Sequence, residues 1–154
     1  MLRALGELAP RAESLGLTIA LENGMAGYAA TTAELLSLAA ECGSPAVGIC
    51  YDSGHAHITE DAAAALATLA PSVVTVHLHD NDGKEDQHLL PEEGTLDWRA
   101  VVAGLRECPR LLHVETEAAN SAAWEWSGPV RPHREVYELY RRILNVPGSG
   151  LSCQ

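Results

Sequence analysis

Four short apolar segments recur along the chain and predict buried β-strands. They lie at residues 17–21, 46–51, 73–78 and 111–114, and they read LTIAL, AVGICY, VVTVHL and LLHV. Each segment is too short for a typical helix, and its apolar residues run continuously instead of alternating with polar ones. Strands of this kind are buried on both faces, as they are in a parallel sheet.

Helical patterns alternate with these segments. The predicted helices span residues 2–15, 33–41, 60–69, 98–106 and 132–144. Gly16 suits the end of the first helix, and Thr31 or Thr32, Thr59 and Asp97 are potential N-caps of the next three. Strict alternation of helix and strand favours right-handed parallel βαβ units, and therefore an α/β fold.

Composition narrows the possible classes of protein. Hydrophobic residues make up 47% of the 154 residues, which is enough for one domain with a core. We assign that domain to residues 1–146 and expect a disordered tail over residues 147–154, which are rich in Pro, Gly and Ser. No apolar stretch approaches the roughly 18 residues of a membrane span. The four cysteines lack CxxC spacing and no secretory signal is evident, so we expect reduced thiols in a cytoplasmic protein.

The net charge of −11, from 21 acidic and 10 basic residues, disfavours nucleic acid as a partner. It also provides carboxylates, which are the ligands that hard divalent cations prefer.

A potential metal ligand lies at the end of each predicted strand. These side chains are Glu22, Asp52, His77 and Glu115, and successive members are 30, 25 and 38 residues apart. One βα unit of an eight-fold barrel has roughly 30 residues, and the carboxyl ends of its parallel strands share one rim. We therefore expect the four side chains to converge. Three carboxylates and one imidazole favour Mn²⁺, Mg²⁺ or Co²⁺, and Zn²⁺ is also possible.

Each of these residues also has an ordinary explanation. A single acidic residue after a strand is usually a helix cap or a solvated loop charge. His77 could be a hydrogen-bonded core histidine, His55 a loop residue, and the acidic segment 80–86 a solvated loop. The recurrence of such residues in all four strands favours a shared site.

The order of short motifs resembles one known family. The motifs are Leu21-Glu22-Asn23, Asp52-Ser53-Gly54-His55, His77-Leu78-His79-Asp80-Asn81, Asp86-Gln87-His88, Gly94-Thr95-Leu96-Asp97-Trp98 and Glu115-Thr116. Together they resemble the xylose isomerase-like barrel superfamily, which includes sugar-phosphate isomerases and epimerases and the endonuclease IV type of repair enzyme. The resemblance covers about residues 1–145. It implies that the four strands and their helices form the second half of a (β/α)₈ TIM barrel.

The resemblance also implies roles for individual residues. Glu22, Asp52, His77 and Glu115 match metal ligands of the epimerases, and Glu22 and Glu115 also match the pair that moves the substrate proton. His55 matches a residue that contacts substrate. Asp86 and His88 match a further ligand pair of the endonuclease branch. His79 lies higher in the loop than His77, where we expect it to contact substrate or a second ion.

These roles suit a divalent-metal-dependent sugar or sugar-phosphate isomerase or epimerase that transfers a proton through an enediolate. A cation stabilises the charge on the enediolate oxygens, and two carboxylates act as base and acid. One alternative is a non-catalytic, metal-binding half-barrel. Another is an endonuclease IV-like phosphodiesterase, which the Asp86-Gln87-His88 motif favours and the net charge opposes.

Four strands are half of what a barrel requires, since a full barrel needs about 250 residues. If helices cover only one face of the sheet, the other face is expected to be apolar, with Ile19, Val47 or Ile49, and Val74 or Val76 as candidates for it. Exposing such a face would be costly, so we predict a homodimer in which a second chain covers it.

Overall fold

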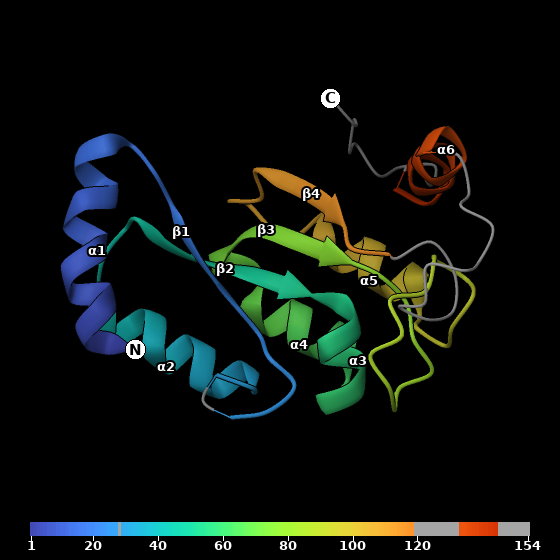
Figure 1. Cartoon of the computed structure of the whole chain (residues 1–154), viewed down its shortest axis with the longest axis horizontal. Coiled ribbons are helices and arrows are strands. Elements are labelled where there is room, and N and C mark those ends of the chain that lie inside the picture. Colours follow the sequence, from blue (N-terminus) through green and yellow to red (C-terminus); the bar gives the residue numbers. More distant parts are fainter. Residues whose placement is uncertain (28, 119–132, 145–154) are drawn as a thin grey trace.

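The structure, a computed structural model, describes residues 1–27, 29–118 and 133–144 (Figure 1). Helices and strands alternate along this part of the chain as predicted, with one additional helix. In chain order the elements are α1 (Leu2–Leu15), β1 (Ile19–Glu22), α2 (Thr32–Cys42), β2 (Val47–Asp52), α3 (Ser53–Thr59), α4 (Ala62–Leu69), the short 3₁₀ helix η1 (Ala70–Ser72), β3 (Val73–Leu78), α5 (Trp98–Leu105), β4 (His113–Thr116) and α6 (His133–Leu144).

Within the described residues, the strands form one parallel sheet in the order β1-β2-β3-β4. Neighbours in sequence are therefore neighbours in space, as they are in one half of a TIM barrel. The strand register aligns Asp52 with His77, and His77 with Glu115. All the carboxyl ends lie at one rim, which faces α3 and the long connection between β3 and α5 (Figure 1).

The hydrophobic core lies between the sheet and its helices. Leu35 and Leu38 of α2, Leu66 and Leu69 of α4, and Val101 of α5 are at most 1% exposed. The strand residues of the same core are Val47, Ile49, Tyr51, Val73, Val76 and Leu78, with Ile19 and Leu21 packed against it. Val47, Ile49 and Val76 belong to this core and Ile19 packs against it, so the expectation that these residues would make the other face of the sheet apolar is wrong.

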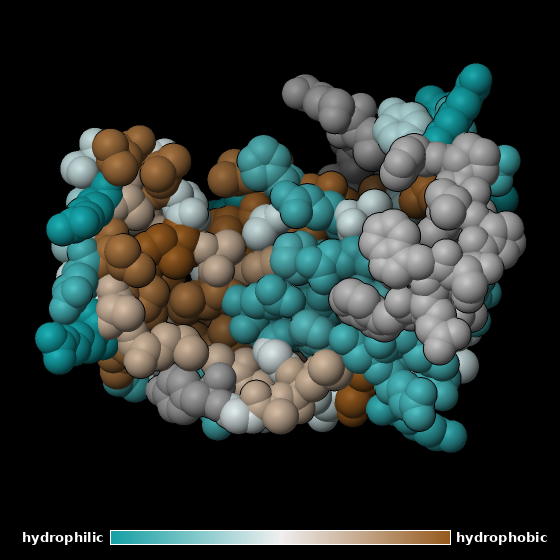
Figure 2. All heavy atoms as spheres, viewed as in Figure 1, coloured by the Kyte–Doolittle hydropathy of each residue, from teal (hydrophilic) through white to brown (hydrophobic). Residues whose placement is uncertain are grey.

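The second face of the sheet is therefore less apolar than the sequence suggested. Side chains alternate along a strand, so this face carries Glu22, Cys50, Asp52 and His77. Exposed apolar side chains lie mainly elsewhere, on α1 and around β1 and β4. Those at these places include Leu2, Leu8, Leu15, Leu17, Leu112 and Val114. Figure 2 shows an apolar area beside α1 and a hydrophilic area over the carboxyl rim.

Two local expectations need correction. Thr59 does not begin a helix; it ends α3, where its hydroxyl donates to the carbonyl of His55 (2.9 Å), and Asp61 caps α4 instead. The last strand spans residues 113–116 and not 111–114. Its limits follow from pairing with β3, which continues to Leu78, whereas the apolar run begins earlier and leaves Leu112 65% exposed.

Other expected features are present. Thr31 forms a capping box with Glu34, Gly16 ends α1 in the left-handed conformation (φ 66°), and Asp97 caps α5. Cys42, Cys50 and Cys108 are free thiols. No helix in the described ranges is long and apolar enough to cross a membrane. Pro132 and the predicted tail lie outside the described residues.

The core makes a specific stability prediction. We expect Leu66→Ala to lower the free energy of unfolding by about 2–5 kcal/mol, because Leu66 lies on the buried face of α4 and is 0% exposed. Leu8→Ala is the matched control, since Leu8 is also helical but 51% exposed. Urea denaturation followed by circular dichroism measures both. Equal losses for the two variants would contradict this location of the core.

Candidate metal and active site

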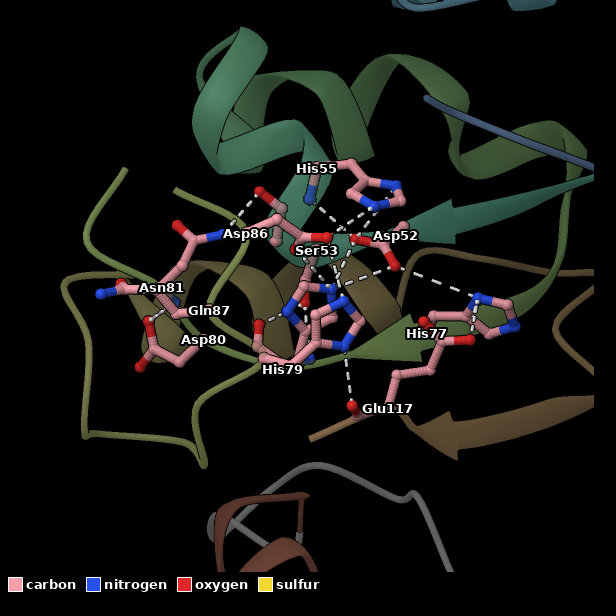
Figure 3. Close-up of polar contacts among 12 residues, drawn as sticks. Asp52, Ser53, His55, His77, His79, Asp80, Asn81, Asp86, Gln87 and Glu117 are labelled. Carbon is pink, nitrogen blue, oxygen red and sulfur yellow. Dashed lines mark hydrogen bonds and ion pairs between the residues drawn. The ribbon is translucent and has the colours of Figure 1, made fainter. Parts of the chain in front are cut away.

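Three of the predicted ligands meet at the carboxyl rim. Glu22 ends β1, Asp52 ends β2 and His77 lies next to the end of β3. The Nδ1 atom of His77 lies 3.5 Å from Glu22 Oε1. The same atom lies 3.9 Å from Asp52 Oδ2, and Figure 3 shows these two side chains facing each other. The structure thus brings these side chains together on one face of the sheet, as the parallel register requires.

Glu115, the fourth predicted ligand, lies on the other side of the His77 ring. Its Oε2 atom is 3.8 Å from Nε2 of His77, and its side chain is 62% exposed. A carboxylate that the sequence analysis did not select, Glu117, places Oε1 3.0 Å from His77 Nδ1. Glu22, Asp52, His77 and Glu117 each offer one ligand atom, and these atoms all lie within 4.8 Å of one another. The available signal was the spacing of two residues from Glu115, which puts both glutamates on one face of an extended chain.

A second group adjoins the first. It consists of His55, His79, Asp86 and His88, whose potential ligand atoms also lie within 4.8 Å of one another. Asp86 is 3.0 Å from His88 Nε2 and 3.6 Å from His55 Nε2, and the rings of His79 and His88 stack at 4.0 Å. The structure thus brings four candidate residues together, namely His55, His79, Asp86 and His88. Their separate positions in the sequence did not guarantee this.

Asp52 joins the two groups. Its side chain is fully buried, and Oδ1 accepts hydrogen bonds from the backbone N–H of His55 (2.7 Å) and from Nε2 of His79 (3.0 Å). Burial alone would raise the pKa of Asp52, but the hydrogen bonds and charges of His79 and His55 outweigh burial and lower that pKa. Asp52 is therefore ionised, which is the form that binds a cation.

Some polar atoms in both groups have no hydrogen-bond partner within the described part of the chain. They include His77 Nδ1, whose contact with Glu117 is close but not directed as a hydrogen bond, and Asp86 Oδ1. Buried polar atoms rarely stay unpaired, and unpaired atoms that lie close to other potential ligands suit a bound cation. The mixture of carboxylates and imidazoles suits divalent metals of the Mn²⁺, Co²⁺ or Zn²⁺ kind.

Two further side chains at the carboxyl rim, His88 and Cys50, have raised pKa values. Burial would lower the pKa of His88, but hydrogen bonding to the Glu117 carbonyl and the charge of Asp86 outweigh it, and the pKa of His88 is raised. Burial, together with the nearby carboxylates, raises the pKa of the Cys50 thiol to about 12. Cys50 lies close to Glu22 and His77, and it is a neutral thiol when no cation is bound.

Asp80 fixes the long loop that carries Asp86 and His88. Its carboxylate is fully buried and accepts hydrogen bonds from Trp98 Nε1 (2.8 Å), the Glu92 N–H (3.0 Å) and the Leu96 N–H (3.1 Å). The solvated-loop explanation of this acidic segment is therefore wrong for Asp80. The residue closes the loop onto the start of α5 and so presents Asp86 and His88 to the rim.

A model of the xylose isomerase-like TIM barrel family matches residues 1–142 of the chain. The chain belongs to this family. The predicted resemblance and the half-barrel fold are therefore confirmed.

Particular relatives support the same conclusion. An uncharacterized protein of Methanocaldococcus jannaschii, MJ1311, is 34% identical over 151 residues, which are 92% of this chain and 48% of that protein. A D-tagatose 3-epimerase-like protein superposes with a TM-score of 0.75 at 26% identity, covering 93% of this chain and 52% of the other. An L-ribulose 3-epimerase gives a TM-score of 0.78 at 20% identity with the same coverage, which shows the shared fold. The chain thus spans about half the length of the relatives that it matches.

The role of Asp80 in this family member can be tested by substitution. We expect Asp80→Asn to lower the free energy of unfolding by about 1–3 kcal/mol, because an amide nitrogen cannot accept all the buried N–H groups that the carboxylate accepts. Asp82→Asn is the control, since Asp82 is exposed in the same loop and a smaller loss is expected there. Thermal and urea unfolding measure both variants. A loss for Asp80→Asn no larger than for Asp82→Asn would show that Asp80 does not hold the loop.

Proposed function

We propose that this chain supplies the metal-binding half of a divalent-metal-dependent isomerase or epimerase that acts on a sugar or sugar phosphate. The observation that carries the proposal is the convergence of Glu22, Asp52 and His77 at the carboxyl rim. Structural relatives named as epimerases support the choice of reaction class. Glu22, Asp52, His77 and a further glutamate would hold Mn²⁺, Mg²⁺ or Co²⁺, with Zn²⁺ as an alternative.

The bound cation would supply the positive charge that stabilises neighbouring oxygens of the substrate as they become negative. Glu22 takes the proton from the carbon beside the carbonyl, and Glu115 returns a proton to the opposite face. The 62% exposure of Glu115 leaves its carboxylate free to approach a sugar. Return of the proton to the same carbon inverts its configuration. Protonation of the neighbouring carbon moves the carbonyl, provided that the hydroxyl proton also passes from one oxygen to the other.

His55 is suited to contact a substrate hydroxyl. Its Nδ1 atom lies 2.9 Å from the Asn23 carbonyl, an acceptor that fixes the proton on Nδ1 in the neutral ring. Nε2 is then the acceptor, and it lies 3.6 Å from Oδ2 of Asp86. Asn23 is itself held by hydrogen bonds with the Asp52 backbone, so the orientation of His55 follows from the pairing of β1 and β2.

The second group allows two further uses. His55, His79, Asp86 and His88 would hold a second cation or bind polar groups of the substrate. An endonuclease IV-like phosphodiesterase also requires more than one cation, and the group is the observation that keeps this alternative open. The net charge of −11 weighs against a polyanionic substrate. A metal-binding half-barrel without turnover is the remaining alternative.

Proton transfer makes a direct prediction. In D₂O with Mn²⁺ and a panel of ketohexoses and ketopentoses, we expect deuterium to enter the product at the isomerised carbon, which NMR detects. Glu22→Gln should reduce the rate on the order of 10²–10⁴-fold because the base is lost. Glu41→Gln, an exposed change on α2, serves as the control. Turnover without deuterium uptake would contradict proton exchange with solvent, and no turnover on any sugar would favour the non-catalytic alternative.

The exposed leucines beside the sheet lead to a prediction about assembly. We expect a homodimer at micromolar concentration, since exposed Leu8, Leu15 and Leu17 lie on α1 and in the connection to β1, and each gains roughly 1.5–3 kcal/mol when fully buried. Sedimentation velocity measures this directly. A homogeneous 16.4 kDa species over the whole concentration range would contradict it.

A further inference from the structure

Two glutamates lie on opposite sides of the His77 ring. Glu117 Oε1 is 3.0 Å from Nδ1, and Glu115 Oε2 is 3.8 Å from Nε2. Glu22 and Asp52 both lie on the Nδ1 side, at 3.5 Å and 3.9 Å. A cation bound to His77 together with Glu22 and Asp52 must therefore sit at Nδ1, which is the side of Glu117.

The backbone of Glu117 is fixed from two directions. Its N–H donates to the Leu78 carbonyl at 3.3 Å, which continues the pairing of β4 with β3. Its carbonyl lies 2.8 Å from Nδ1 of His88, a residue of the second group. The side chain is 37% exposed, against 62% for Glu115. Glu117 thus connects the two groups through its backbone while its carboxylate faces the first.

We propose that Glu117, and not Glu115, is the glutamate that completes the metal site with Glu22, Asp52 and His77. This inference rests on the proposed function and assigns its fourth ligand. The set then has three carboxylates, all on the Nδ1 side of the His77 ring, and the His77 imidazole itself.

Glu115 acquires a separate role. A histidine that binds a metal through one ring nitrogen commonly donates its other N–H to a carboxylate, which fixes the tautomer. Nε2 of His77 faces Glu115, so Glu115 is placed to receive that N–H. Its carboxylate is not tied to the cation and stays available for proton transfer to substrate. One residue of the pair thus holds the metal and the other serves the reaction.

A thiolate placed at each position distinguishes the two glutamates. The starting variant is Cys50→Ser, because the Cys50 thiol lies near Glu22 and His77 and would itself report on a bound metal. Glu117→Cys and Glu115→Cys are then made separately in the full chain and titrated with Co²⁺ alone. A thiolate bound to Co²⁺ produces a strong charge-transfer band in the near ultraviolet. We expect this band with Glu117→Cys and not with Glu115→Cys.

A second measurement covers the possibility that a cysteine variant fails to fold. Isothermal titration with Mn²⁺ compares Glu117→Gln with Glu115→Gln, and circular dichroism checks the fold of each. Loss of an outer partner of a ligand typically weakens metal affinity about 10–100-fold, so Glu115→Gln should stay within that range and Glu117→Gln should exceed it. A charge-transfer band for Glu115→Cys alone, or an equal or greater loss of affinity in Glu115→Gln, would overturn the assignment of Glu117. If the Cys50→Ser protein binds neither Co²⁺ nor Mn²⁺, the proposed function fails with it.

Discussion

The arrangement of side chains at the carboxyl ends of the strands depends on one charged carboxylate, that of Asp52, which is fully buried. An isolated buried charge is strongly unfavourable unless it is paired and hydrogen-bonded. Asp52 meets this requirement with neighbours from three directions: the His55 N–H at the start of α3, the His79 ring just after β3, and Asn23 just after β1, which pairs with its backbone. These contacts fix where β2 ends, how α3 begins and which way the histidines point. The residue that caps a helix is thus also the residue between the two candidate ligand groups.

The sequence predicted the elements best where the local signal was strong. Leu2–Leu15 ends at Gly16 as expected, and Thr31 and Asp97 cap their helices. The helix Ser53–Thr59 was not predicted, because it is short, contains Gly54 and lacks an apolar stripe. It forms because Asp52 caps it and because it packs on the sheet, a close fit in which an added Cβ on Gly54 would overlap the His79 ring. That contact is between residues far apart in sequence, which no local pattern reports.

The candidate site was predictable to a similar degree. Parallel strands place their carboxyl ends together, so the convergence of Glu22, Asp52 and His77 follows from the strand pattern alone. The place of Glu117 in the group did not follow, because the apolar run of the last strand ends at Val114 while pairing with β3 continues to Thr116. An apolar run marks residues that are buried under helices. The strand β4 lies at the edge of the described sheet and is exposed along its whole length, so an apolar run does not mark its limits. The limits of such an edge strand are set by hydrogen bonding, which composition does not reveal.

The two faces of the sheet have different chemistry, and the difference explains how half of a barrel can hold a site. Large aliphatic side chains of the strands lie under the helices, where burial stabilises the fold without help from a second half. The opposite face carries small and polar groups, from Gly48 and Cys50 to Asp52 and His77, which tolerate water better than leucine or isoleucine would. Asp80 then closes the β3–α5 loop over one end of that face through buried hydrogen bonds of its own. The candidate ligands are therefore positioned by contacts inside this chain, while a wall for the substrate would have to come from beyond the described residues.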